Sequence, residues 1–191
     1  MELGLIILLS YLMGSIPFGF ILTKIFLKKD IREIGSGNIG ATNVLRTGNK
    51  LIGYITLSLD ILKAIVPLLI IKFNQSEFLF ISALAIFLGH VFPLWLKFKG
   101  GKGVATYVGM LFCMNYILGF VFIGVWLFTF LISKYSSLSS LLGSLSVPIY
   151  LFIFTSQNSI FFSIMFILIF YTHRENVKRL KNKEESKTKI Y

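Results

Sequence analysis

The run FLFISALAIFLGHVFPLWL occupies residues 78–96, and KFKGGKGVAT follows it directly at residues 97–106. The first string is almost wholly apolar and has about the 20 residues that a helix needs to cross a bilayer. The second string is basic and rich in glycine. Because lysines directly after an apolar run mark the cytoplasmic end of a membrane helix, this junction predicts a transmembrane helix that ends at the cytosol.

The whole chain repeats this pattern of apolar runs and short polar loops. It has 191 residues, of which 55% are hydrophobic and 14% are charged, and its mean hydropathy is +0.81. A soluble domain of this length cannot bury so much apolar surface in one core, whereas lipid can cover it. We therefore expect an all-α integral membrane protein with a single polytopic domain over residues 1–191. Residues 182–191 are expected to form a frayed cytoplasmic tail.

The number of spans depends on two long apolar regions. Residues 104–133 and 138–172 are each too long for one comfortable span and short for two. If Gly119 and the polar cluster at 155–159 are turns, the chain has about seven transmembrane helices; if neither region turns back, it has about five. The seven-helix arrangement is favoured because it places Lys134 with the other bases. One span each is predicted over residues 3–27, 51–71 and 78–96.

Basic residues are concentrated on one side of these spans. Most basic residues lie on one side of the predicted membrane: those between residues 24 and 50, those at 97–102 and those in the tail from His173. Lys72 lies on the other side. This asymmetry predicts an N-terminus outside and a cytoplasmic C-terminus. The formal net charge of +11 would raise nucleic-acid binding in a soluble protein. Here it orients the chain, so we expect the lipid bilayer as a partner and no nucleic acid.

The first cytoplasmic loop contains GSGNIGATNVLR at residues 35–46. Its glycines allow successive backbone N–H groups to turn toward one point and form an anion nest. A helix is expected to begin near Ala41 and to face the anion with its positive end. The structural alternative is a tight loop of small residues packed under helices. The predicted donors from this loop are Gly35, Ser36, Gly37, Asn38, Gly40, Thr42, Asn43 and Arg46.

The second segment surrounds Lys102 with glycines, which indicates backbone donors and a point charge for a phosphate group. The alternative is a positive stop signal for the preceding span, which explains the lysines but not the glycines. His90 is weaker evidence, since a single histidine near a helix end is more often structural than catalytic. The predicted binding residues here are His90, Lys97, Gly100, Gly101, Lys102, Gly103 and Thr106.

The third segment is HRENVKRL at residues 173–180. If it is helical, His173 and Asn176 share a face because they lie three residues apart. The alternative is an ordinary basic tail after the last span. Asp60 and Lys63, also three apart, are expected to form an ion pair within the second span, because ionisable groups in a membrane are costly and usually paired.

Together these segments resemble the bacterial acyl-phosphate:glycerol-3-phosphate acyltransferases, the PlsY family. The resemblance covers nearly the whole chain in order. Family members usually place a Gly and a Glu soon after the third motif, whereas KNKE at 181–184 has no Gly, so the role of Glu184 stays open. The matching strings are GSIPFG (14–19), GSGNIGATNVLR (35–46), LDILKA (59–64), GHVFP (89–93), FKGGKGVAT (98–106) and HRENVKRL (173–180).

The resemblance implies a seven-helix fold of the bacterial cell membrane with its active site facing the cytosol. It implies transfer of an acyl group from acyl phosphate to the sn-1 hydroxyl of glycerol 3-phosphate, giving lysophosphatidic acid and phosphate. Acyl-CoA and acyl carrier protein would not be used directly. Other glycerol-phosphate acyltransferases use an H-x-x-x-x-D pair, but Trp95 stands five residues after His90 and Lys178 five after His173.

Residue roles follow from the resemblance. Ser36 would polarise the donor carbonyl, Lys102 would neutralise phosphate and Asn176 would orient a substrate. His173 or a substrate phosphate would be the base. Arg174 is included among the binding residues. No cofactor is expected, and no metal site is indicated, because the carboxylates are scattered and Cys113 is the single cysteine.

Two other functions compete with this one. An organophosphate or phosphate transporter would place polar groups near the membrane midplane, where this chain offers mainly Asp60 and Lys63. A non-catalytic protein that binds anionic lipid through its basic loops would tolerate a change such as Gly37→Ala.

Overall fold

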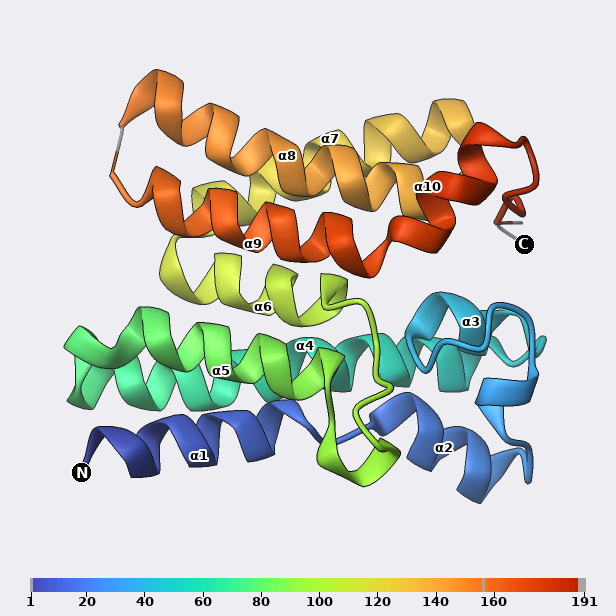
Figure 1. Cartoon of the computed structure of the whole chain (residues 1–191), viewed down its shortest axis with the longest axis horizontal. Helices are drawn as coiled ribbons and strands as arrows, with labels where there is room; N and C mark the ends of the chain where they lie inside the picture. The colour runs from blue at the N-terminus through green and yellow to red at the C-terminus, as the bar shows by residue number, and fades with distance from the viewer. Residues whose placement is uncertain (1, 156, 189–191) are drawn as a thin grey trace. The chain divides into compact units, whose positions relative to one another are not determined.

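The computed structural model describes residues 2–155 and 157–188, and within these ranges every regular element is a helix. The contacts divide the chain into two compact units, one ending at Met114 and the other beginning at Asn115. Figure 1 shows the helices of both units. The expected all-helical class is confirmed.

The first unit begins with a broken helix. Helix α1 (Leu3–Gly14) and helix α2 (Phe18–Phe26) are separated at Pro17, which has no N–H to continue the helical hydrogen bonds. Helix α1 packs closely on α5 (Leu79–Val91), since a Cβ on Gly14 would overlap the Ile86 carbonyl. Small residues at such a contact let two membrane helices approach.

The rest of this unit surrounds a long helix, α4 (Lys50–Asn74), which packs against α1, α2, α5 and α6 (Val104–Met114). Asn49 caps α4 by accepting a hydrogen bond from the Ile52 N–H at 3.0 Å. The short elements of the unit are η1 (Ile31–Glu33), α3 (Ala41–Leu45), η2 (Ser76–Phe78) and η3 (Leu94–Leu96).

The second unit is a helical hairpin with a third helix packed on it. Helix α8 (Ser136–Phe154) contacts both α7 (Tyr116–Ser133) and α9 (Ser159–Thr172). The chain then bends by 62° into α10 (Arg174–Lys181), which is basic. The segment that the sequence left open as a helix or a basic tail is therefore helical from Arg174 to Lys181.

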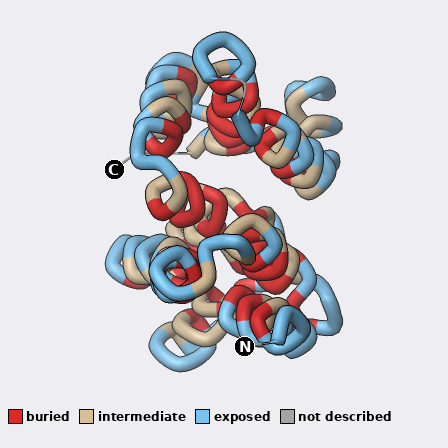
Figure 2. Tube along the Cα trace, turned by 90° about the vertical axis from the view of Figure 1, so that its left-hand side faces the viewer, coloured by how far each residue is buried: buried red, intermediate tan, exposed pale blue. Residues whose placement is uncertain are grey.

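Apolar side chains cover the outer faces of these helices. Phe73, Ile132 and Ile160 are each more than two-thirds exposed. Figure 2 shows helices with one buried and one exposed face. A water-soluble protein rarely exposes so many large apolar groups, so these faces are suited to lipid.

The predicted spans agree with the structure in part. Among the described residues, five helical stretches are long and apolar enough to cross a membrane, α9 with α10 would give a sixth, and α6 is a shorter apolar helix. Both long regions divide into two helices, and the predicted break in the second region is confirmed, because α8 ends at Phe154 and α9 begins at Ser159. The turn expected at Gly119 is wrong, because the break lies at Asn115, whose side chain accepts a hydrogen bond from the Ile117 N–H and starts α7 there.

Candidate active site

The first glycine-rich loop is built around the buried amide of Asn43. Its Nδ2 donates to the carbonyl oxygens of Ile31 at 3.1 Å, Ile34 at 2.8 Å and Asn38 at 2.8 Å. Its Oδ1 accepts the Ser36 N–H at 2.9 Å. The Nδ2 group has two hydrogens, so at least one of them is shared between two carbonyls. One side chain therefore links four backbone groups of an irregular loop and serves as its framework.

Ser36 and Arg46 lie at the exposed end of this loop. Gly35 (φ +56°) and Gly37 (φ +69°) flank the serine in the left-handed region that favours glycine. A Cβ on Gly35 would come within 3.1 Å of the Arg46 Cδ, so the stem of the arginine passes beside this glycine. Helix α3 begins at Ala41, as expected. The other predicted loop residues, Gly40 and Thr42, lie between these points, and Gly40 donates its N–H to Asn38 Oδ1 at 2.9 Å.

Arg32 also lies near the loop, but Asp30 engages its guanidinium. The Arg32 Nε and Nη2 atoms donate to Asp30 at 2.9 Å and 2.6 Å. These hydrogen bonds lower the pKa of Asp30 to about 2. The pair caps η1 and supports the start of the loop.

The second glycine-rich loop returns to the end of α5 and touches the first loop. Gly100 and Gly101 donate their N–H groups to the carbonyls of Val91 and His90, both at 3.0 Å. Asn38 Nδ2 lies 3.4 Å from the Gly100 carbonyl, at the long end of hydrogen-bonding range. Two segments that are far apart in sequence therefore meet in one unit of the protein.

Lys102 stands between Gly101 and the start of α6. Gly103 has φ +84°, and a Cβ there would overlap the Phe87 ring, so the turn requires glycine. Thr106 is buried, and its hydroxyl donates to the Gly103 carbonyl at 2.9 Å. Thr106 thus shapes the turn that presents the half-buried Lys102.

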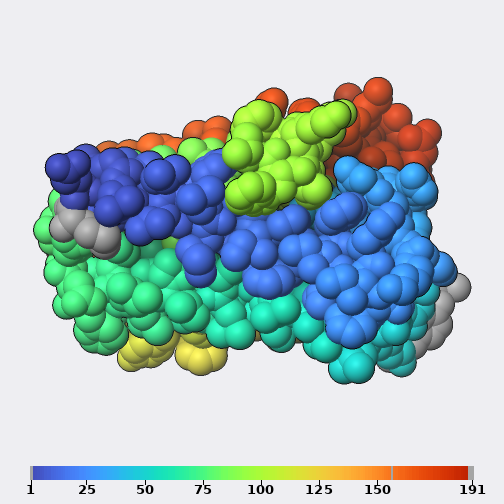
Figure 3. All heavy atoms as spheres, turned by 90° about the horizontal axis from the view of Figure 1, so that it is seen from below, coloured from blue at the N-terminus to red at the C-terminus, as the bar shows by residue number. Residues whose placement is uncertain are grey.

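The segment between α5 and this loop is fixed to the break in the first span. Trp95 Nε1 donates to Ser15 Oγ at 2.8 Å, and the Tyr11 hydroxyl donates to the Phe92 carbonyl at 2.7 Å. Figure 3 shows this yellow-green segment lying against the blue N-terminal helices. Lys97 follows η3 with φ +52° and is exposed.

His90, a predicted ligand, is buried with 4% exposure. Its Nδ1 lies 3.9 Å from Asp60 Oδ1. Asp60 in turn lies 2.8 Å from the Lys63 ammonium, so the ion pair expected within α4 is confirmed.

His173 lies buried at the bend between α9 and α10. Its Nδ1 is 2.8 Å from the Ile169 carbonyl oxygen. Because a carbonyl can only accept, this bond places a proton on Nδ1. In the neutral imidazole, Nε2 then carries the lone pair that a general base needs.

Asn176 shares the buried face of α10 with His173, as the three-residue spacing predicts. Its Nδ2 donates to Glu185 Oε1 at 2.7 Å. Glu185 also accepts hydrogen bonds from Ser137 Oγ and Arg179 Nε, both at 2.7 Å. Burial alone would raise the pKa of Glu185. The three hydrogen bonds together lower the pKa by more than burial raises it, so the net shift is downward. The carboxylate therefore anchors one amide hydrogen of Asn176.

The sequence did not single out Glu185. The carboxylate that holds α10 is one residue beyond Glu184, and Lys183 makes the preceding turn with φ +60°, a conformation in which glycine is favoured. The sequence contains no signal for Glu185, because the turn before it uses Lys183 where a glycine would have marked it. Thr188 also donates its N–H to the carbonyl of Lys134, which lies between α7 and α8, at 2.9 Å. The frayed tail over residues 182–191 stays a prediction. Residues 189–191 lie outside the described part.

Arg174 points away from this buried face. Its Nη1 donates to the Tyr171 carbonyl at 3.1 Å, and its guanidinium stacks on the Tyr171 ring at 4.6 Å. The structure thus gathers the predicted residues of the first two motifs in the first unit, and those of the third motif in the second unit.

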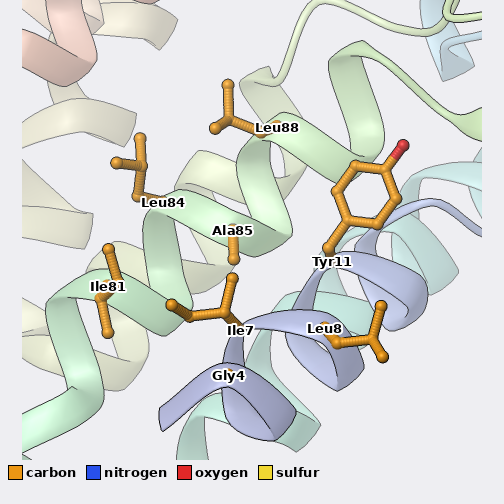
Figure 4. A pocket seen from close by; sticks show the side chains of 8 residues that line it. All are labelled: Gly4, Ile7, Leu8, Tyr11, Ile81, Leu84, Ala85 and Leu88. Carbon is orange, nitrogen blue, oxygen red and sulfur yellow. The ribbon is translucent and has the colours of Figure 1, made fainter.

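The first unit also has an apolar groove of about 310 Å³ between α1 and α5. Figure 4 shows its lining, in which Tyr11 carries the one polar side chain among the eight described lining residues. That hydroxyl donates to Phe92, so this groove offers apolar surface and little for a phosphate.

Comparisons with known proteins agree with the motifs. The sequence model of the glycerol-3-phosphate acyltransferase family matches residues 4–183. A glycerol-3-phosphate acyltransferase of Pelagibacter ubique (strain HTCC1062) is 74% identical over 191 residues, which cover 100% of both chains. One from Rhodopseudomonas palustris (strain HaA2) is 50% identical over 183 residues, or 95% of this chain and 93% of that protein.

Two crystal structures of PlsY (YgiH), an integral membrane glycerol 3-phosphate acyltransferase, share the fold. The glycerol 3-phosphate form has a TM-score of 0.90 at 38% identity, and the lysophosphatidic acid form has 0.86 at 36%. In each case the match covers 97% of this chain and 94% of the other. The similarity thus extends over nearly the whole length in both sequence and fold.

Proposed function

The chain belongs to the glycerol-3-phosphate acyltransferase family, and from this premise we propose its acyl donor, its reacting hydroxyl and the roles of its residues. At the level of family and general activity, the resemblance predicted from the sequence is confirmed: this is an integral membrane glycerol-3-phosphate acyltransferase. The relatives give no support to the transporter alternative.

We propose that the donor is an acyl phosphate and that the acceptor is the sn-1 hydroxyl of glycerol 3-phosphate. The observation that carries this proposal is the meeting of the two glycine-rich loops at Asn38 and Gly100. The exposed Ser36 hydroxyl can donate to a phosphate oxygen, and Arg46 and Lys102 supply positive charge in the two loops. Two phosphorylated substrates need two anion sites, and this pair of loops can provide both.

The reaction needs no protein nucleophile, because an acyl phosphate is a mixed anhydride and already activated. The acceptor oxygen attacks the acyl carbon, a new C–O ester bond forms, and the C–O bond to phosphate breaks. The phosphate leaves with that electron pair, and the hydroxyl proton passes to a base. The Ser36 hydroxyl stabilises the negative charge on the carbonyl oxygen.

His173 is the proposed base, with the substrate's own phosphate as the alternative acceptor of the proton. The bond from Nδ1 to Ile169 supports the first option, because it leaves Nε2 as the basic nitrogen. Asn176, held by Glu185, orients a substrate with its remaining amide atoms. Acyl-CoA and acyl carrier protein have no direct role in this proposal.

The membrane arrangement is also a proposal. We infer about seven spans, with α6 and α9 as the short ones, a cytoplasmic C-terminus and an active site facing the cytosol of a bacterial cell. The basic loops and α10 support this orientation, because positive charge is retained on the cytoplasmic side.

Phosphate release tests the proposed donor. Purified protein in detergent is mixed with palmitoyl phosphate, with and without glycerol 3-phosphate, and both phosphate and lysophosphatidic acid are measured. We expect release to require the acceptor and to equal the ester formed. Transfer from palmitoyl-CoA with none from palmitoyl phosphate would contradict the proposal.

A further inference from the structure

Lys63 is bound to the break in the first span. Its ammonium lies 2.8 Å from Asp60 Oδ1 and donates to the Ile16 carbonyl at 2.7 Å. Ile16 precedes Pro17, where the helix is interrupted and the carbonyl has left the regular helical ladder. The ion pair thus ties the middle of α4 to the junction between α1 and α2.

His90 lies between this ion pair and the second glycine-rich loop. One edge of its ring places Nδ1 3.9 Å from Asp60 Oδ1. The opposite edge faces Gly101, because a Cβ on Gly101 would overlap His90 Nε2 and the two ring carbons beside it. The His90 carbonyl also accepts the Gly101 N–H at 3.0 Å. Side chain and backbone of one residue therefore fix the position of the glycine before Lys102.

Burying three ionisable side chains costs free energy, so their presence in the protein interior indicates a role. Asp60, Lys63 and His90 are 2%, 4% and 4% exposed. Ionisable groups within a membrane-spanning region are rare and are usually paired or functional. None of the three belongs to the proposed chemical steps.

We propose that Asp60, Lys63 and His90 form a positioning cluster that sets the Gly100–Lys102 turn relative to the broken first span. His90 then acts on the phosphate site through Gly101, and it is a positioning residue in place of the substrate ligand expected from the sequence. This inference rests on the proposed function to the extent that the turn binds phosphate.

A double-mutant cycle tests the contact. Gly101→Ala drives a methyl group into the imidazole and should raise KM for at least one phosphorylated substrate about tenfold, with kcat changed less. His90→Ala removes the ring, so adding it should recover at least fivefold of the Gly101→Ala loss. If His90 is a ligand, the two losses should multiply, and that result would overturn the proposal.

Hydrogen exchange of residues 97–103 provides a readout that does not need activity. Lys63→Met should speed exchange of the Gly100 and Gly101 amides at least tenfold, and Asp60→Asn added to it should restore part of the protection by removing the unpaired charge. Ser82→Ala, a buried α5 residue, is the matched control and should leave this exchange unchanged. If Lys63→Met slows turnover but leaves hydrogen exchange at residues 97–103 unchanged, the proposed positioning role of the cluster is wrong.

The two proposals can fail separately. If the wild-type protein shows no acceptor-dependent phosphate release, the proposed donor is wrong, while exchange and thermal unfolding still report on the cluster. If release is normal but the cycle is additive, the positioning role is wrong and the donor stands.

Discussion

Asn43 organises the first glycine-rich loop from within. Its amide holds three carbonyls and one N–H from the surrounding backbone. The sequence indicates that an asparagine in a glycine-rich loop is a donor, but it cannot tell whether the donor faces a ligand or the loop itself. That distinction depends on where the carbonyls of residues 31–38 point after folding.

Asn43→Ala should therefore damage the loop before it damages chemistry. Loss of a buried hydrogen-bonding group costs about 1–3 kcal/mol, because its partners remain unsatisfied. We expect a lower thermal unfolding temperature in detergent together with weaker substrate binding. An unchanged unfolding temperature with strongly reduced kcat would instead make Asn43 a direct participant.

Ser36→Ala should have the opposite profile. The hydrogen bond from Ser36 to Asn43 uses the backbone N–H of Ser36, which alanine keeps, and the Ser36 side chain is exposed. We expect normal stability and a kcat lowered roughly 100-fold, as for loss of one donor to a developing oxyanion. Ser76→Ala, an exposed serine at the opposite end of α4, is the control. Turnover within twofold of wild type would exclude the hydroxyl from catalysis.

At the scale of elements, α10 and the tail behind it form one folded piece. The helix supplies Asn176 and Arg179, the tail supplies Glu185, and Ser137 of α8 completes the cluster. If the segment was helical, the spacing of His173 and Asn176 predicted that the two residues share a face. The anchor of the helix could not be predicted, because the tail is polar and charged and its turn uses Lys183 in place of a glycine.

Lys183→Gly should stabilise this piece. A residue with a side chain pays roughly 1 kcal/mol or more in the left-handed conformation that Lys183 adopts, and glycine does not. We expect slower hydrogen exchange at residues 182–188 with unchanged turnover. Lys187→Gly, a nearby exposed position, serves as the control. Faster exchange in Lys183→Gly would show that the turn is not under this constraint.

The docking of the tail should depend on pH. The net lowering of the Glu185 pKa below its ordinary value of 4.5 means that the folded state favours the carboxylate. This stabilisation is present above pH 4.5 and is lost as the pH falls through the lowered pKa. The protection factor of the Thr188 amide, which compares its exchange rate with the intrinsic rate at the same pH, should fall below pH 4.5 in the wild type. In Glu185→Gln the protection factor should already be low at pH 7 and should vary less with acid than in the wild type.

Of the two helix breaks predicted from the sequence, one was placed correctly and one was not. The polar cluster at 155–159 is visible in the sequence, whereas the break at Asn115 depends on one capping side chain in an apolar run. Gly119 proved compatible with the interior of α7, where it is buried. A single glycine is a weak helix breaker compared with an asparagine cap.

At the scale of the whole molecule, apolar runs and loop charge were sufficient to predict an all-helical membrane protein. The family motifs, taken together and in order, then predicted the general activity. The motifs could not show which of the polar groups bind substrate and which stabilise the scaffold. An example is the cluster of Asp60, Lys63 and His90, whose side chains are of the types found in active sites. The burial of these side chains and the distances between them favour a structural role.

The central claim is that each of the three motif segments faces the cytosol, as the proposed orientation requires. Cys113 is the single cysteine and is buried, so Cys113→Ala provides a background for one reporter cysteine at a time at the exposed positions Ser36, Lys99 and Lys178. The measurement is labelling by a membrane-impermeant maleimide in intact cells and in inside-out vesicles. We predict that all three positions react only in inside-out vesicles and that glycerol 3-phosphate with palmitoyl phosphate slows labelling at Ser36→Cys. Labelling of any of the three from outside intact cells would contradict the account.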